Sequence, residues 1–152
     1  MKKIIILTLM VAAFFSSCSN SNKPNQTFDP DEERVAITEK YWKLITLYGQ
    51  EVQMSENQER EAFFRLTSDG KLAGFGGCNA INGNYTLEKG FRIQFDKVAT
   101  SLRACDEGID ESSFLKVFNT ADNYSLSEND SKLTLNKARM APLAVFRSVV
   151  FK

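Results

Sequence analysis

The chain has 152 residues, with 19 basic and 19 acidic side chains and no histidine. The balanced charge argues against a nucleic-acid-binding protein, which would need a basic face. The absence of histidine removes the usual proton shuttle near neutral pH, the histidine-dependent nucleophile systems and nearly all zinc sites. We therefore expect a protein without catalytic residues, metal or cofactor.

The first 17 residues have the pattern of a secretory signal. Lys2 and Lys3 precede the run 4–15, which is apolar apart from one threonine, and two serines follow. This run is too short for a bilayer, which takes about 20 residues, but it suits a signal peptide with small residues before its cleavage site. Because Cys18 comes directly after those small residues, the signal resembles a lipobox. The pattern predicts cleavage before Cys18 and attachment of lipid to it.

The segment after Cys18 favours a lipid-anchored protein. Residues 19–27 contain only Ser, Asn, Lys, Gln, Thr and one Pro, a composition that cannot offset the entropy cost of ordering. We expect residues 18–38 to be the lipidated cysteine and its polar tether, and residues 39–152 to be the domain. One acyl chain anchors a protein only weakly. The cysteine of a bacterial lipoprotein, however, resembles cases in which several acyl chains are attached. The expected location is the cell envelope, on the outer membrane facing the periplasm.

Eight short segments of the domain have the β-forming residues or the apolar–polar alternation typical of strands. They are residues 41–47, 62–67, 71–77, 84–87, 91–95, 123–126, 132–135 and 143–151. The dipeptides Asp69-Gly70 and Asn82-Gly83 are typical of hairpin turns. Such a succession of hairpins predicts a curled antiparallel sheet or a small barrel.

One helix is predicted between the fifth and sixth strands. Asp110 and Glu111 suit its N-terminus. Apolar residues then follow at helical spacing: Phe114, Leu115, Val117, Phe118 and Ala121. The fold class we expect is mainly β, of the α+β type: a small antiparallel, barrel-like sheet of about eight strands, with one helix inserted before the last three strands.

Four motifs occur in order along these elements. They are Trp42-Lys43-Leu44, then Gly76-Gly77-Cys78-Asn79 with Gly83-Asn84-Tyr85, then the segment from Thr100 through Arg103 to Cys105, and finally Phe114-Leu115. Their order and spacing resemble the META domain, the HslJ-like family of small bacterial envelope and secreted proteins. The resemblance covers about residues 39–151.

The resemblance implies structural roles for the motif residues: Trp42, Gly76, Gly77, Asn79, Gly83, Tyr85 and Arg103. The physical properties of these residues agree with such roles. Glycines permit a positive φ or a close approach of two strands, and an asparagine can bond neighbouring backbone in a turn. The family also implies an association with heat shock or stress and, in some members, with altered resistance to novobiocin. It supplies no molecular mechanism.

The two cysteines of the domain are expected to pair. Setting Cys18 aside leaves Cys78 and Cys105, and an exported compartment favours disulfides. The bond would close a loop of about 27 residues and stabilise the fold by about 3 kcal/mol on the chain-entropy model. Two buried free thiols that never meet are the alternative.

Two groups of residues in or near the motifs could form a binding site instead of having a structural role. The acids at 106, 107, 110 and 111 could hold a cation, but they lack the spacing of a calcium loop, so a solvated helix start is the better interpretation. Aromatic surface at Phe75 or Tyr85 could form a binding patch.

These patterns together predict a non-catalytic envelope lipoprotein, monomeric and held on the membrane by its lipid. Its role would be stress-related binding or envelope maintenance, with another envelope protein as the candidate partner. The alternative is a carrier or inhibitor module that binds a small hydrophobic ligand inside or beside the barrel.

Overall fold

The computed structural model describes residues 36–54, 56, 58, 60–104 and 109–150. The signal segment, Cys18, most of the tether and Cys105 lie outside the described residues, so what the sequence predicts for them stays a prediction. Within the described part, no helix is long and apolar enough to cross a membrane.

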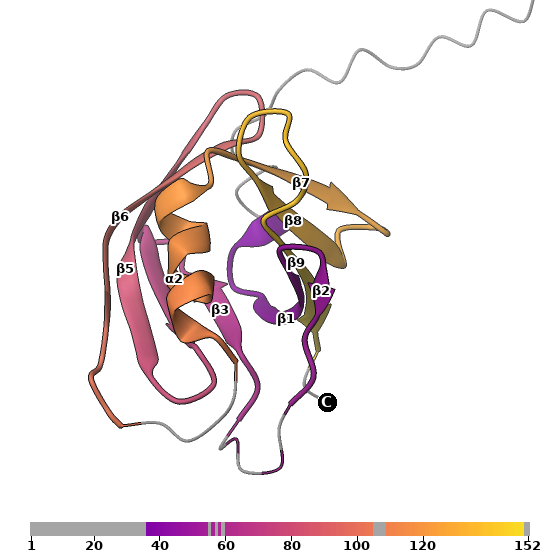
Figure 1. Ribbon diagram of the computed structural model, residues 1–152. Coiled ribbons are helices and arrows are strands. Elements are labelled where there is room, and N and C mark those ends of the chain that lie inside the picture. The colour runs from indigo at the N-terminus through magenta and orange to yellow at the C-terminus, as the bar shows by residue number, and fades with distance from the viewer. Residues whose placement is uncertain (1–35, 55, 57, 59, 105–108, 151–152) are drawn as a thin grey trace, which may run out of the picture.

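The described residues form nine strands and the helix α2 (Figure 1). In chain order these are β1 (Tyr41–Leu47), β2 (Gln50–Glu51), β3 (Phe63–Leu66), β4 (Lys71–Phe75), β5 (Ala80–Glu88), β6 (Arg92–Thr100), α2 (Glu111–Thr120), β7 (Asn123–Ser127), β8 (Lys132–Asn136) and β9 (Ala144–Val149).

Eight of the strands close into an antiparallel barrel. Each of β3 to β8 pairs with the next strand, β1 pairs with β3, and β9 pairs back with β1. The short β2 is an extra strand on the end of β1. Closure removes the unpaired edges that an open sheet would expose. The structure thus confirms a mainly β barrel with one helix before its last three strands.

Strand β1 shows how the side-chain pattern fixes which face is inside. Trp42 and Leu44 alternate into the core, as the period of two requires. The register with β9 then shifts between Leu44 and Thr46, which marks a β-bulge. Because a bulge adds one residue, Leu47 also faces the core.

Helix α2 covers the barrel with its aromatic face and helps to fill the interior. Phe114 and Phe118 are 0% and 1% exposed. The ring of Phe118 meets Phe64 of β3 and Phe95 of β6 at 5.5 and 5.1 Å between ring centroids, both edge to face. Burial of each such side chain stabilises the fold by about 1.5–3 kcal/mol. Figure 1 shows α2 lying between β5 and β6 on one side and β7 to β9 on the other.

The prediction of a hairpin turn at Asn82-Gly83 is wrong, because both residues lie inside β5. Asn82 pairs with Ala99 and Asn84 with Asp96, so two residues of β6 face Gly83 alone. A Cβ at Gly83 would come within 3.2 Å of backbone atoms of β6. The glycine therefore serves the close approach of two strands at a bulge.

Gly74 of β4 provides a test of the packing between β3 and β4. A Cβ there would lie 2.6 Å from the backbone oxygen of Phe63, which cannot move without disturbing the ladder. We expect Gly74→Ala to lower the free energy of unfolding by about 1–3 kcal/mol, measured by denaturant titration with the fluorescence of Trp42. The neighbouring exposed Ala73→Ser should change it by less than about 0.5 kcal/mol. Equal midpoints for the two variants would contradict the close approach.

Candidate functional site

The second and third motifs meet at the N-terminus of α2. The turn between β4 and β5 contains Gly76 to Asn79, and the segment after β6 contains Ser101 and Arg103. The turn contacts the first residue of α2, Glu111, and the segment after β6 contacts the turn through Asn79. We call this group of Cys78, Asn79, Ser101, Arg103 and Glu111 the clasp.

Asn79 is the centre of the clasp and is 6% exposed. Its Oδ1 accepts hydrogen bonds from the backbone N–H of Arg103 at 2.8 Å and from the hydroxyl of Ser101 at 2.9 Å. Since a backbone N–H can only donate, this contact fixes which atom of the amide is the oxygen. The Nδ2 group must then face Glu111, and it donates to Glu111 Oε2 at 2.7 Å.

Glu111 joins the clasp to the helix. Besides the amide of Asn79, its carboxylate accepts the backbone N–H groups of Cys78 at 2.9 Å and Asn79 at 2.6 Å, both on Oε1. Hydrogen bonds to an ionised acceptor are the stronger kind. One carboxylate on the first residue of α2 thus fixes the turn between β4 and β5 against the helix.

Two glycines make room for this carboxylate. A Cβ at Gly76 would lie 2.6 Å from Glu111 Oε1, and Gly77 has φ +110°, which L side chains rarely adopt. The N–H of Gly76 donates to the oxygen of Asn79 at 2.8 Å and closes the turn. These contacts hold the Gly-Gly-Cys-Asn turn against the start of α2.

The match to known families agrees with this geometry. Residues 35–150 match the family model of the META domain. The chain belongs to the META domain family. No curated protein matches the chain. Among solved structures, the chain is similar to one described as the NMR structure of the protein from Burkholderia xenovorans, with a TM-score of 0.62, 18% sequence identity and coverage of 99% of this chain and 100% of that one. At this identity the likeness concerns the fold.

The other motif residues of this META domain lie away from the clasp and fix separate parts of the barrel. Trp42 is fully buried and donates its indole N–H to the backbone oxygen of Ile37 at 2.9 Å. Tyr85 donates its hydroxyl to the oxygen of Thr67 at 2.8 Å, which ties β5 to the turn after β3. Gly83 lies at the bulge in β5.

An aromatic binding patch at Phe75 or Tyr85 does not exist in this structure. The two side chains are 7% and 5% exposed. Phe75 is also covered by Arg60, whose guanidinium carbon lies 4.8 Å from the ring centroid. The alternation along β5 turns Tyr85 toward the core. Phe75 lies opposite Phe63 in the β3–β4 pairing, on the other face of β4 from the core residue Leu72, and is buried there beneath Arg60.

The acidic residues at the start of α2 have partners within the protein. Asp110 caps the helix: the hydroxyl groups of Ser112 and Ser113 and the N–H of Ser113 donate to its carboxylate and lower the pKa of Asp110 to about 2. Residues 106 and 107 lie outside the described residues. Among the residues that are described, no group of Cys, Asp and Glu is arranged to hold a metal ion.

Cys78 lies at the edge of the clasp. Its Sγ is 4.0 Å from the backbone oxygen of Ala104, the residue that precedes Cys105 in the chain. The motifs in the sequence pointed to Asn79 and Arg103, and the structure places these two residues together. No motif in the sequence pointed to Glu111 as a partner of the turn, because its contacts are with residues 32 and 33 positions away in the chain.

The clasp predicts a charge-dependent coupling between Asn79 and Glu111. In Asn79→Asp, a carboxylate replaces the amide donor at 2.7 Å from Glu111 Oε2, so we expect the free energy of unfolding at pH 7 to fall by about 2–3 kcal/mol. Adding Glu111→Gln restores one donor between the two groups and should recover part of this loss. Denaturant titration of the wild type, both single variants and the double variant gives the coupling energy.

The same set of variants contains its control. Glu111→Gln alone turns an amide donor toward the donor of Asn79 and should destabilise the protein. The loss in Asn79→Asp should shrink in acid, because protonation of one carboxyl removes the repulsion. Strictly additive effects, with no change in acid, would show that the two side chains do not interact.

Proposed function

We propose that this META-domain protein is a lipid-anchored component of the bacterial cell envelope that acts by binding or scaffolding, without catalysis. The observation that carries the proposal is the sequence pattern before the domain: residues 1–17 have the pattern of a secretory signal, Cys18 follows directly, and a polar stretch separates it from the segment that matches the META domain. The resemblance to HslJ-like proteins adds a role in stress resistance or envelope maintenance. The protein would act as a monomer, with an envelope protein as its partner.

Two features support a role without catalysis. The polar side chains of the clasp bond to one another, and among the described residues no buried side-chain nitrogen or oxygen lacks a partner. Aromatic side chains from α2, β3, β6 and β9 pack against each other inside the barrel. This filling favours a binding function on the outside of the barrel over a hydrophobic ligand within it.

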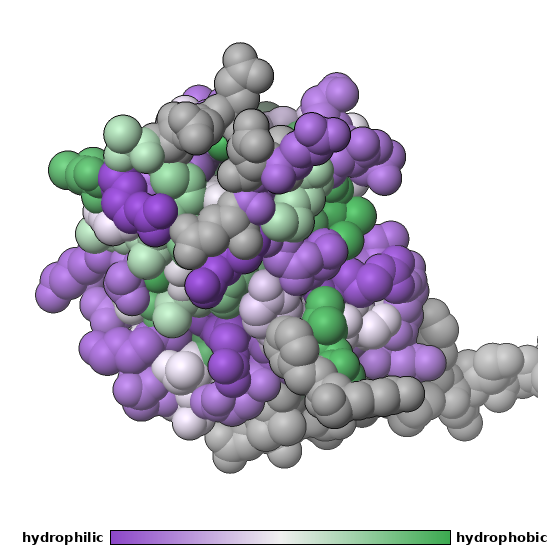
Figure 2. Space-filling model, turned by 90° about the horizontal axis from the view of Figure 1, so that it is seen from below, coloured by the Kyte–Doolittle hydropathy of each residue, from purple (hydrophilic) through white to green (hydrophobic). Residues whose placement is uncertain are grey.

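The outer surface also gives little support for a hydrophobic carrier. On the face drawn in Figure 2, hydrophobic areas are interspersed with hydrophilic side chains. Exposed apolar side chains such as Met54 (54% exposed) and Leu102 (96% exposed) occur in the described part, and single residues of this kind are common on protein surfaces.

The lipid anchor is tested by Cys18→Ser. We expect the wild type to sediment with the outer membrane and to incorporate labelled palmitate, and the variant to do neither, because stable attachment requires the acyl chains. Only the wild type should restore growth of a deletion strain under heat or novobiocin. Ser19→Ala, next to the modified position, is the matched control and should behave as the wild type.

Membrane sedimentation of Cys18→Ser at the wild-type level would refute the anchor. A deletion strain that grows normally under both stresses would refute the stress role and leave the anchor unaffected, so the two parts fail separately.

A disulfide between Cys78 and Cys105 is also proposed, since Cys78 Sγ lies beside Ala104. We expect neither thiol to react with an alkylating agent in denaturant unless a reductant is added, as measured by mass spectrometry. Reduction, or Cys78→Ser, should lower the free energy of unfolding by about 3 kcal/mol on the chain-entropy model. Complete alkylation of both cysteines without reductant would show that they are free thiols.

A further inference from the structure

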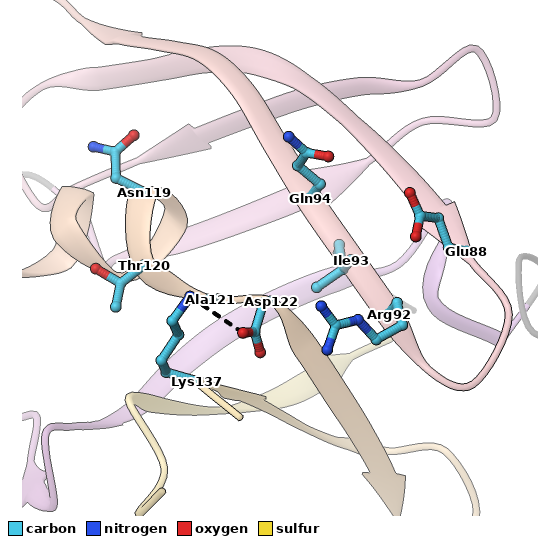
Figure 3. A pocket seen from close by; sticks show the side chains of 9 residues that line it. All are labelled: Glu88, Arg92, Ile93, Gln94, Asn119, Thr120, Ala121, Asp122 and Lys137. Atoms are coloured by element: carbon cyan, nitrogen blue, oxygen red, sulfur yellow. Dashed lines mark ion pairs between the residues drawn. The ribbon is translucent and has the colours of Figure 1, made fainter. Parts of the chain in front are cut away.

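A cavity of about 230 Å³ lies at the C-terminal end of α2, at the opposite end of the helix from the clasp. Its walls come from the end of β5, the start of β6, the segment from α2 into β7 and the residue that follows β8 (Figure 3). A helix of ten residues is about 15 Å long, so the cavity and the clasp are separate features.

Four charged side chains line this cavity: Glu88, Arg92, Asp122 and Lys137. Two of them already pair, with Lys137 Nζ 3.2 Å from Asp122 Oδ2. Asp122 Oδ1 also accepts the N–H of Ala138 at 2.8 Å and the amide of Asn123 at 2.7 Å. These hydrogen bonds, led by the one from Ala138, lower the pKa of Asp122 to about 2. This half of the cavity needs no ligand to balance its charge.

The other two charged side chains do not have such partners in the described part of the chain. Glu88 and Arg92 lie directly opposite each other in the pairing of β5 with β6. Directly opposite residues have Cβ atoms about 5 Å apart, yet neither side chain forms an ion pair or side-chain hydrogen bond with any of the described residues. Figure 3 shows both among the side chains around the cavity, with the guanidinium of Arg92 directed toward the side of the cavity where Asp122 lies.

We propose that this cavity binds a small zwitterion, an α-amino acid, between Arg92 and Glu88. The guanidinium offers a planar pair of donors to a carboxylate, and the Glu88 carboxylate can accept from an ammonium group. A ligand with both charges satisfies both residues. A simple anion would face Glu88, and a simple amine would face Arg92.

The size and floor of the cavity fit this class of ligand. Pockets for drug-sized molecules have about 300–1,000 Å³, so a cavity of about 230 Å³ suits a smaller molecule. Ile93 and Ala121 supply apolar floor for a short side chain. The last turn of α2 contains no basic residue, so its carbonyl groups add negative potential for the ammonium group.

The test uses three probes of similar size that differ in charge: alanine, lactate and ethylamine. Each is titrated into the full chain in detergent micelles while backbone amide signals are followed by NMR. We expect saturable shifts with alanine at the amides of Arg92, Ile93 and Ala121, and binding at least about tenfold weaker with lactate and with ethylamine, because each loses one charge-assisted contact.

Arg92→Gln and Glu88→Gln should each weaken alanine binding by about tenfold or more. Arg65→Gln on β3 and Glu51→Gln on β2 remove the same charges from exposed positions away from the cavity and should bind as the wild type. An unchanged amide spectrum in each variant confirms that the barrel is intact.

The proposal is overturned if alanine produces no saturable shifts at these amides, if lactate or ethylamine binds the wild type as well as alanine does, or if both cavity variants keep wild-type affinity. The comparison of probes on the wild type stands even if a variant folds poorly. Because binding is measured on purified protein, the result is independent of membrane anchoring and of the stress phenotype.

Discussion

The Glu111 carboxylate is the contact on which the arrangement of this domain depends. The helix is inserted between β6 and β7, so its position relative to the turn between β4 and β5 is not fixed by chain connectivity. Glu111 fixes it by accepting two backbone N–H groups and the amide of Asn79. Asn79 in turn holds the segment after β6 through Ser101 and Arg103. Glu111 and Asn79 together therefore join the start of α2 to two loops at the same end of the barrel.

The position of α2 then determines both the core and the cavity. With its first residue held at the clasp, the helix places Phe114 and Phe118 against aromatic rings of the sheet. Its last turn reaches the start of β6, where the sheet contributes Glu88 and Arg92. The motif residues of the clasp thus act on the fold, and Glu88 and Arg92, two exposed charged side chains that form no ion pair with a described residue, lie at the other end of the same helix.

Local patterns in the sequence were sufficient for most of the fold. Alternation and turn residues predicted the eight barrel strands, and apolar spacing predicted the helix from Phe114 onward. They were insufficient at Asn82-Gly83, because a glycine required by a bulge has the same local sequence as one required by a turn. Glu111 was recognised only as a favourable residue at a helix start, because its partners lie 32 and 33 positions away. The cavity depends on strand register and helix placement, which no local pattern contains.

The filled interior restricts where a partner or ligand can bind. Small β-barrels either fill their interior with side chains or enclose a ligand, and here rings from α2, β3, β6 and β9 occupy the centre. Ligand recognition by this domain must therefore use the surface or the barrel ends. The clasp end is occupied by internal hydrogen bonds, whereas the end at Arg92 and Glu88 presents two opposite charges that do not pair with each other. Charge complementarity thus favours that end for a polar ligand.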